Sequence, residues 1–142
     1  WRAFKARGAE LRELYLDGCT ALSETDLLQV VDACPSLRVL SLRGCYQIGD
    51  ECLLTLASRC SPALDVLDVT CLPSVNDGVL VSLVNQHALR ALNAASCPLG
   101  AAAVHQLAVA CPALVFVCLD APSARQVAAA QVAADATTTT TT

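Results

Sequence analysis

The sequence predicts an α/β fold: a right-handed solenoid, arched like a horseshoe, with short parallel strands on its concave face and helices on its convex face. The main observation is a recurring template, Leu-x-x-Leu-x-Leu, which is complete at Leu11 and Leu37, ends in Val69 and Ala94 in the copies that start at Leu64 and Leu89, and returns in weaker form at Leu114. The central hydrophobic residues of these copies are separated by 26, 27, 25 and 25 residues. This interval is that of leucine-rich repeats, so the repetition alone indicates the fold class.

Within each repeat, the Leu-x-Leu run predicts a strand, and a turn and a helix are expected to follow it. Because strand side chains alternate between two faces, the leucines should point into the core and the residues between them should face the other way. Each helix shows an apolar stripe at helical spacing. The stripe residues are Leu22, Leu27, Leu28 and Val31 in the first repeat, Ile48, Leu53, Leu54 and Leu56 in the second, Val75, Val79, Leu80 and Leu83 in the third, and Val104 and Leu107 in the fourth.

Capping and stop signals mark the ends of these helices. Asp50 and Asp77 stand where a helix start favours an acid, and Ser23 or Thr25 can serve the first helix in the same way. A Cys-Pro pair or a close variant closes the helices, because proline cannot continue a helix and directs the chain toward the next strand. These closing signals are Cys34-Pro35, Cys60-Ser61-Pro62 and Cys111-Pro112.

The length of 142 residues favours one continuous core over two domains. Residues 11–122 are predicted to form about five repeats, and residues 1–10 the end of a preceding repeat or an N-terminal cap. Residues 123–136 are Ala-rich and predict a C-terminal helix. Residues 137–142 are a poly-Thr tail, a composition typical of disorder or of a segment held by a neighbour.

Nine cysteines raise the alternatives of zinc or disulfides, and their spacing argues against both. No Cys-x-x-Cys occurs, the number is odd and only two His are present. Six of the nine recur at two repeat positions, the turn after the strand (Cys19, Cys45, Cys97) and the end of the helix (Cys34, Cys60, Cys111). A small buried thiol suits these tight places, so we expect structural cysteines, no metal, and a reducing intracellular compartment, the cytoplasm or nucleus.

The run from Cys34 through Asp50 shows the most complete composite, Cys-Pro-x-Leu-x-x-Leu-x-Leu-x-x-Cys-x-x-Ile-x-Asp. This pattern resembles the cysteine-containing leucine-rich repeats of F-box and leucine-rich-repeat proteins, over about residues 11 to 120. The third repeat departs from it, because Leu72 takes the place of the turn cysteine and Cys71 lies one residue early. Gln86 and His87 also replace the expected Cys-Pro. A contact region and simple sequence drift explain these departures equally well.

The resemblance implies a substrate receptor of a cullin-type ubiquitin ligase, in which an upstream F-box binds the adaptor and the repeats bind the target. No F-box-like segment is visible in these residues, so a cullin adaptor is expected as a partner only if an F-box lies outside them. Relatives without an F-box act as fixed subunits. The alternative is therefore an architectural subunit of a large stable assembly, which docks through the faces or ends of the solenoid.

Composition limits the other classes of function. Charged residues make up 15% of the chain against 55% hydrophobic ones, and the net charge of -4 argues against nucleic acid as the main partner. The sequence contains no long apolar stretch without charges, so it predicts no membrane span. His87 and His105 lack a nucleophile and acid at a recognisable spacing, and no glycine-rich phosphate loop occurs. We therefore expect no catalytic residue, no cofactor and no enzymatic activity.

The alternation of strand residues predicts a partner-binding surface on the concave face. Its acids outnumber its one Arg, so a basic segment of another protein is the expected partner, with Tyr15 and Phe116 as possible anchors. Ordinary solvated strand positions are an equally good interpretation. The predicted residues are Glu13, Tyr15, Asp17, Ser41, Arg43, Asp68, Thr70, Asn93, Phe116 and Asp120.

The size of this face sets a further expectation. Five strands at a spacing of about 4.8 Å, with about four residues each, present roughly 300 Å². A standard interface buries roughly 800 Å² on each partner. The turns, the helices or neighbouring repeats must therefore contribute to any stable complex.

Overall fold

The computed structural model describes residues 7–85, 89–110 and 114–119. Strands and helices alternate along this part of the chain, as the repeats predict. The strands are β1 (Glu13–Tyr15), β2 (Val39–Ser41), β3 (Val66–Asp68), β4 (Ala91–Asn93) and β5 (Phe116–Cys118). The helices between them are α2 (Glu24–Asp32), α3 (Asp50–Arg59), α4 (Asp77–Asn85) and α5 (Ala101–Ala110).

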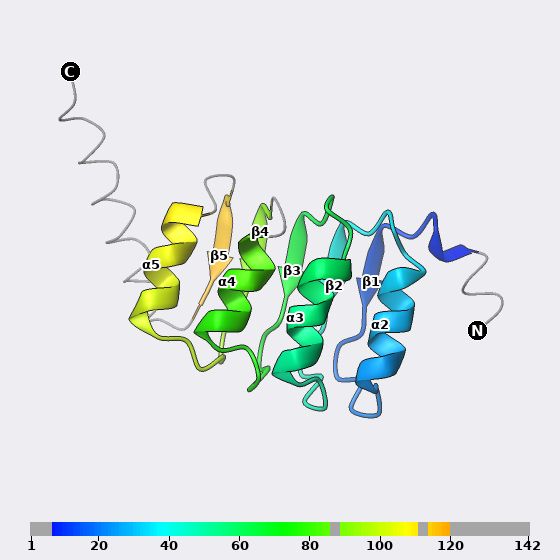
Figure 1. The fold of residues 1–142 in the computed structure, drawn as a ribbon, viewed down its shortest axis with the longest axis horizontal. Helices are drawn as coiled ribbons and strands as arrows, with labels where there is room; N and C mark the ends of the chain where they lie inside the picture. Colours follow the sequence, from blue (N-terminus) through cyan, green and yellow to red (C-terminus); the bar gives the residue numbers. More distant parts are fainter. Residues whose placement is uncertain (1–6, 86–88, 111–113, 120–142) are drawn as a thin grey trace, which may run out of the picture.

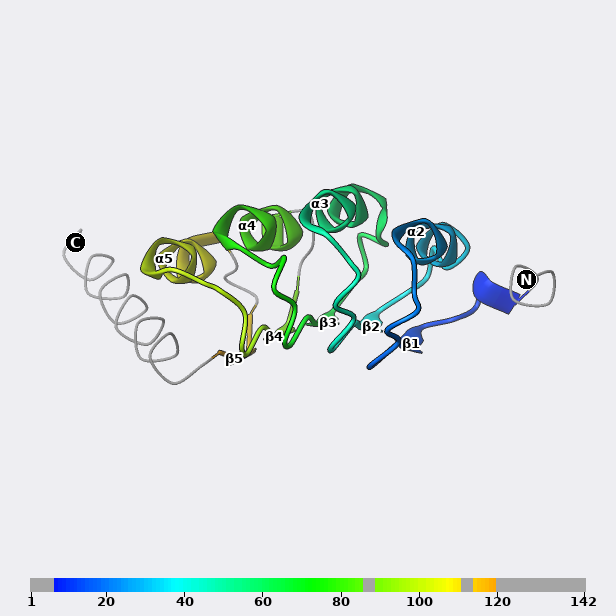
Figure 2. The same cartoon turned by 90° about the horizontal axis from the view of Figure 1, so that it is seen from below.

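The five strands form one parallel sheet in the order β1-β2-β3-β4-β5. The register pairs Leu14 with Leu40, Leu40 with Leu67, Leu67 with Leu92 and Leu92 with Val117, so equivalent positions of the template are neighbours. The four helices lie side by side on one face of this sheet (Figure 1). Seen from below, the two layers follow a shallow arc with the helices on the outer side (Figure 2). The mixed α/β architecture with five parallel strands is confirmed, and the right-handed horseshoe solenoid stays a prediction.

The ladder of backbone hydrogen bonds continues beyond the short strands into the turns. Leu16 N–H donates to the Ser41 carbonyl at 2.9 Å, and Gly18 N–H donates to the Arg43 carbonyl at 2.7 Å. The next repeat repeats this pattern, with Gly44 N–H donating to the Thr70 carbonyl at 3.0 Å. Residues up to three positions past β1, β2 and β3 are therefore held in the same register as the strands themselves.

The core lies between the sheet and the helices and is built from the template residues. Leu37, Leu40 and Leu42 are fully buried, and so are their equivalents Leu67 and Leu92. Burying one such side chain contributes about 1.5–3 kcal/mol relative to leaving it in water. In the first repeat, the equivalents Leu11, Leu14 and Leu16 are only half-buried, because no described segment packs on their outer side.

Most residues of the predicted helix stripes are buried, but Leu22 and Leu28 are half-buried and Leu54 is exposed. Leu22, Ile48 and Val75 also lie before the helices and not within them. Leu53 and Leu56 are fully buried, whereas the Leu54 side chain is 43% exposed. Successive helix residues are rotated by about 100°, and α3 fills its inner face with Cys52 and Ala57 instead. The prediction that Leu54 belongs to the buried stripe is therefore wrong. The side chain of Val104 lies outside the described part of the structure.

The helix starts use side chains from two successive repeats. Ser23 is the N-cap of α2 and accepts a hydrogen bond from Asp26 N–H at 3.1 Å, which confirms one of the two predicted caps. Asp50 and Asp77 are the first residues of their helices, as expected. The Glu24 carboxylate, at the start of α2, accepts a hydrogen bond from Gly49 N–H at 2.8 Å in the next repeat. An acid at one helix start thus satisfies a backbone donor at the next.

The turn after each of the first four strands contains one residue with a positive φ. These residues are Gly18 (65°), Gly44 (68°), Cys71 (60°) and Ser96 (58°). The third repeat is therefore shifted for a structural reason: Cys71 takes the left-handed position that glycine takes in the first two repeats. Leu72 then fills the buried turn position, where it is fully buried.

The turn cysteines join adjacent repeats. Cys45 Sγ donates to the Leu16 carbonyl at 3.0 Å, and Cys97 Sγ donates to the Val69 carbonyl at 3.1 Å. Cys45 is fully buried, as the sequence predicts. Cys19 is exposed, because the first described repeat has no described neighbour before it.

The predicted domain ends lie mostly outside the described residues. Residues 7 and 8 are helical, within the segment 1–10 that was expected to end a preceding repeat or cap the chain. The predicted helix at 123–136 and the poly-Thr tail at 137–142 lie outside the described residues, as does the His87 irregularity. Where the chain is described, its helices are all too short or too polar to cross a bilayer.

Candidate functional site

The sheet presents one face to the helices and the other away from them, and we call the second one the sheet face. Its side chains form rows across the strands, because the strands pair in register. One row lies at the strand starts (Glu13, Val39, Val66, Ala91, Phe116) and one at the strand ends (Tyr15, Ser41, Asp68, Asn93, Cys118). The continuing backbone ladder extends the alternation to a third row, which holds Asp17, Arg43 and Thr70.

The structure separates the predicted binding residues into three groups. Glu13, Tyr15, Asp17 and Arg43 are exposed on the sheet face, and Asp68 and Asn93 are half-buried there. Phe116 belongs to β5, but its side chain is outside the description, and Asp120 lies outside the described residues altogether.

Ser41 and Thr70, which were also predicted to bind a partner, are buried in the structure. Their residues are only 5% and 6% exposed. Ser41 stands between Tyr15 and Asp68 in its row, and larger neighbours cover a small side chain in the middle of a sheet. The Ser41 hydroxyl donates to an Asp17 carboxylate oxygen. The Thr70 hydroxyl oxygen is buried without a hydrogen-bond partner in the described structure.

The carboxylates of the sheet face are held in place by neighbouring donors. The Tyr15 hydroxyl donates to Glu13 Oε2 at 3.1 Å, and this hydrogen bond to a nearby carboxylate raises the pKa of Tyr15. Asp68 accepts from the Asn93 side chain at 3.1 Å and from Thr70 N–H at 2.9 Å. Three negative groups from two strands therefore have fixed positions, which lowers the entropy cost of binding a cation.

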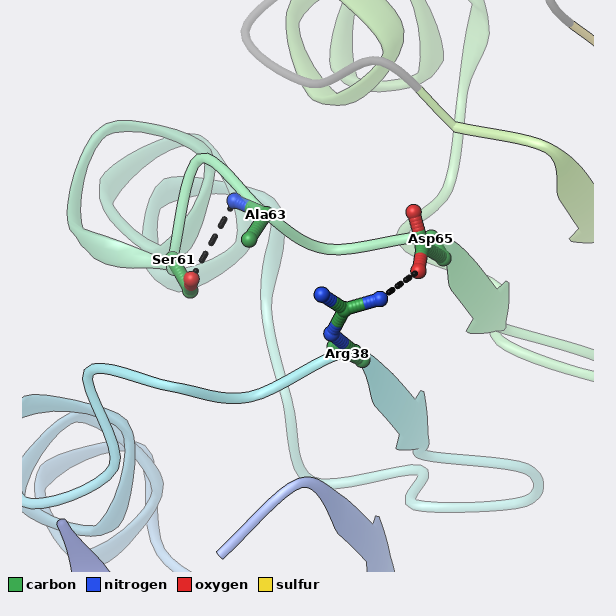
Figure 3. A network of polar contacts seen from close by, with 4 residues as sticks. All are labelled: Arg38, Ser61, Ala63 and Asp65. Atoms are coloured by element: carbon green, nitrogen blue, oxygen red, sulfur yellow. Dashed lines mark hydrogen bonds and ion pairs between the residues drawn. The ribbon is translucent and has the colours of Figure 1, made fainter. Parts of the chain in front are cut away.

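The opposite edge, where the strands begin, carries the basic residues. Arg12, Arg38, Asp65 and Arg90 each precede a strand and follow one another in the backbone ladder. Arg38 and Asp65 form an ion pair across two repeats at 3.3 Å (Figure 3). Both side chains are partly exposed, so this pair contributes little to stability and mainly neutralises Asp65. The sheet thus has arginines along the edge where its strands begin, and the sheet face has one described carboxylate in each of its three rows, with Arg43 also in the third.

The loop that leads into β3 has its own local order. Ser61 is buried and its hydroxyl oxygen accepts a hydrogen bond from Ala63 N–H at 3.2 Å (Figure 3). This bond stabilises the turn at Cys60-Ser61-Pro62. The turn has one residue more than the Cys-Pro pairs that close other helices. The ion pair at Arg38 is therefore positioned by a regular turn and not by a flexible connection.

A second exposed surface follows the strand ends, and the alternation rule missed it. We call it the turn ledge: Thr20, Tyr46, Pro73 and Pro98, which occupy the same position in four successive turns. All four are exposed, and Tyr46 is 59% exposed, almost as much as Tyr15 at 61%. Two shallow hollows of about 410 and 570 Å³ adjoin it and share Tyr46 and Cys71. This row could have been found in the sequence by comparing, from repeat to repeat, the residue that follows the turn cysteine, or that follows Leu72 where it replaces the cysteine.

The described residues give this surface binding chemistry and little reactive chemistry. They contain no group of three His, Cys, Asp or Glu residues that could hold a metal ion. Burial raises the pKa of the Cys52 and Cys60 thiols to about 11, so both stay protonated near neutral pH. Cys71 is partly exposed beside the turn ledge, and His105 is exposed on α5.

Two solved structures have a similar fold. The tropomodulin C-terminal domain of Caenorhabditis elegans matches with a TM-score of 0.68 and 18% sequence identity, covering 92% of this chain and 90% of that one. A leiomodin-1 structure named actin-binding site 2 matches with a TM-score of 0.63 and 10% identity, covering 92% and 84%. Identities this low establish a shared fold alone.

Sequence comparison adds one relative over a short stretch. A putative RNA-binding protein of Caenorhabditis elegans is 38% identical over 58 residues, which is 41% of this chain. The chain spans only 8% of the length of that protein. No family model matches the chain.

These comparisons correct the resemblance inferred from the repeats. The assignment to the F-box and leucine-rich-repeat proteins is wrong, because the similar solved structures are tropomodulin and leiomodin domains. The physical reason is that the template records the spacing of buried strand leucines and turn cysteines. That spacing is needed wherever such units stack, so it indicates the packing and not the family. The chain therefore has a leucine-rich-repeat-like α/β fold similar to the tropomodulin and leiomodin domains.

Proposed function

We propose that the chain is a non-catalytic protein-binding module whose sheet face binds a basic segment of another protein. The observation that carries this proposal is the sheet face itself. Glu13 in β1, Asp17 just after β1 and Asp68 in β3 lie on the same face of the sheet, with β2 between the two strands, and each accepts a hydrogen bond from an adjacent donor. Preorganised carboxylates attract and orient a positively charged segment at little entropic cost.

The comparisons give this proposal limited support. The name of the leiomodin-1 structure says that it is an actin-binding site, so one protein with a similar fold is named for binding another protein. Actin is accordingly a probe worth including in a binding assay, whereas the shared fold does not make it the proposed partner. The RNA-binding name belongs to a protein of which this chain matches a small part, and the net charge of -4 disfavours RNA.

The test compares one charge reversal on two faces of the molecule. Glu13→Lys changes an exposed residue of the sheet face, and Glu51→Lys makes the same change on the exposed side of α3. The tagged full-length protein and both variants are purified from cells, and co-purifying proteins are quantified by mass spectrometry. We expect Glu13→Lys to reduce the retained partner about tenfold and Glu51→Lys to leave it unchanged.

Equal loss of the partner from both variants would indicate a nonspecific charge effect and contradict the proposal. Loss from Glu51→Lys alone would place the interface on the helices. Circular dichroism of each variant checks that the fold is retained, which is expected because both side chains are exposed.

The outer side of the first described repeat favours a second candidate, an architectural subunit of a stable assembly. In this repeat, Leu11, Leu14 and Leu16 are half-buried, whereas their equivalents in the next repeat are fully buried. Stacked repeats cover one another's apolar sides, and a permanent partner can supply such a cover here. Equal stoichiometry of a fixed set of partners after a high-salt wash would support this candidate. Substoichiometric partners that exchange with added protein would support the recognition module.

We also propose a reducing compartment, such as the cytoplasm or nucleus, as the place where the chain acts. Eight described cysteines are free thiols, and four of them are buried. Free thiols at recurrent packing positions suit an environment in which disulfides are rare. Expression as a fusion to a fluorescent protein tests this, because a secreted pool with oxidised cysteines would contradict it.

A further inference from the structure

We propose that the turn ledge is the second half of the docking surface, and that one extended partner segment crosses both parts. In this arrangement a basic residue of the segment lies against Asp17, and an apolar residue lies against Tyr46, over the hollow lined by Pro73 and Pro98. The inference rests on the proposed function of the sheet face. It adds the chemistry of the partner: a basic residue and an apolar residue at a fixed separation.

The ledge is a regular surface, because the backbone repeats the same left-handed turn. Gly18, Gly44, Cys71 and Ser96 have φ values between 58° and 68° and stand at equivalent positions. The ledge residue lies two positions after each of them and is exposed in every case. Thr20, Tyr46, Pro73 and Pro98 therefore form a row parallel to the rows of the sheet face.

Tyr46 is placed to contact a ligand on both sides. A Cβ added at Gly44 would lie 3.8 Å from the Tyr46 hydroxyl oxygen and 3.9 Å from Cζ, so the ring reaches back over the glycine. Tyr46 and Cys71 border both hollows. An exposed tyrosine offers a large contact area and has only two side-chain torsions to order, which is typical of binding hot spots.

The two hollows differ in charge. The smaller one is bounded by Asp17 and Arg43 from the sheet face and by Thr20 and Tyr46 from the ledge, so it joins the two surfaces. Among the described residues, the larger one is lined only by uncharged side chains, those of Tyr46, Cys71, Pro73, Ser96, Cys97 and Pro98. A segment with a basic residue at one end, facing Asp17 rather than Arg43, and an apolar residue at the other end complements both hollows.

The area of the sheet face and the distance from Asp17 to the uncharged hollow also support an extended segment as the partner. The sheet face alone offers roughly 300 Å², against roughly 800 Å² per partner for a standard interface, so an adjoining surface is required. Asp17 belongs to the first repeat, and the uncharged hollow lies between the third and fourth. At about 4.8 Å per strand the separation is about 12 Å, which an extended peptide spans in three or four residues.

The experiment uses the purified 142-residue chain and a displayed library of random 12-residue peptides. Selected peptides are synthesised, and their dissociation constants are measured with the wild type, Tyr46→Ser, Tyr15→Ser and Val109→Ser. Tyr46 and Tyr15 are 59% and 61% exposed and form a matched pair on the ledge and the sheet face. Val109 is 67% exposed on α5 and is the control on the helices.

We expect selected peptides to carry Lys or Arg three or four positions from a Pro or another apolar residue. Tyr46→Ser should weaken their binding about tenfold, and Val109→Ser should change it less than twofold. Weakening by Tyr15→Ser with no effect of Tyr46→Ser would overturn the ledge and leave the proposed function intact. Weakening by Val109→Ser alone would overturn both.

A footprint of Cys71 tests the same inference without a substitution on the ledge. Cys71 is partly exposed between the two hollows, and Cys19 is an exposed thiol outside their linings. A saturating selected peptide should slow iodoacetamide labelling of Cys71 several-fold relative to Cys19. Unchanged labelling of Cys71 would contradict the ledge as a binding surface.

Discussion

A left-handed backbone residue recurs in the turn after each of the first four strands, and the sequence satisfies it in two ways. Gly18 and Gly44 adopt a positive φ at little steric cost, whereas Cys71 and Ser96 adopt it with a side chain. A non-glycine residue in this region is strained by about 1–2 kcal/mol. The third and fourth turns are therefore less relaxed than the first two.

Cys71→Gly is expected to stabilise the chain by about 0.5–1 kcal/mol, because relief of the left-handed strain exceeds the added entropy of the unfolded glycine. Gly18→Ala should destabilise the chain by about 1 kcal/mol, because alanine is strained at a φ of 65°. A Cβ there would contact nothing within 4 Å, so no clash adds to this strain. Urea unfolding measures both. If Cys71→Gly lowered the midpoint, the strain argument would be wrong.

The buried thiol of Cys60 predicts a loss of stability in alkali. Burial raises its pKa from 9.0 to about 11 in the folded chain. Between these values the unfolded chain releases the thiol proton while the folded chain keeps it. The free energy of unfolding should therefore be unaffected by this group below pH 9 and should fall by about 1.4 kcal/mol per pH unit above it.

Urea unfolding from pH 8 to pH 10.5 checks this, with Cys60→Ala as the comparison. The variant should lose less stability over this range than the wild type, although cavity formation lowers its stability at every pH. Parallel curves for the two proteins across the whole range would show that Cys60 does not contribute to the alkaline loss.

The exposure of three residues, Ser41, Arg43 and Tyr46, shows what the sequence of a single repeat does not determine. Alternation along β2 and its turn placed Ser41 and Arg43 on the same face, which is right, but only Arg43 is exposed. Exposure depends on the size of neighbours on other strands, and a single repeat does not contain that information. Tyr46 was missed because it lies in a turn, where a period of two has no meaning.

At the scale of elements, the start of one helix supports the start of the next. Glu24 accepts a hydrogen bond from Gly49 N–H at 2.8 Å, and Asp77 does the same for Gly100 N–H at 2.7 Å. A Cβ at Gly49 would lie 2.7 Å from Glu24 Oε1, so a larger residue there would displace the carboxylate. The carboxylate thus both caps and spaces adjacent helices.

Glu24→Ala is expected to destabilise the chain by about 1 kcal/mol, because Gly49 N–H loses its partner and the start of α3 loses a nearby negative charge. Thr25→Ala is the control, since Thr25 is the next residue and is exposed. Thermal unfolding of the two variants measures the difference. Equal melting temperatures would show that water replaces the carboxylate without loss.

The element order was the most predictable part of the structure. The Leu-x-Leu runs located all five strands, and the stripe Val75, Val79, Leu80 and Leu83 is buried as predicted. The stripe of α3 was predicted less well, because the helix turns Cys52 and Leu53 toward the core and leaves Leu54 outside. The choice among these residues depends on the rotation of the helix, which packing against α2 and α4 sets.

At the scale of the whole molecule, the helices and the sheet bury one shared core between them. The outward sheet face is therefore not used for packing between the two layers and is available for binding. Its carboxylates come from strands that lie far apart in the sequence and meet only in the sheet. The sequence therefore predicted the face and its acidity, whereas the hydrogen bonds that hold the acids and the adjoining ledge required the structure.

Carboxyl footprinting of the purified complex tests the central claim most directly. Carbodiimide and glycine ethyl ester label exposed carboxylates, and mass spectrometry compares each site in the free chain and in the complex. The sheet-face residues Glu13 and Asp17 should be labelled several-fold more slowly in the complex, while Asp50 and Glu51 at the start of α3 should be unchanged. Protection of Asp50 and Glu51 with full labelling of Glu13 and Asp17 would contradict binding through the sheet face.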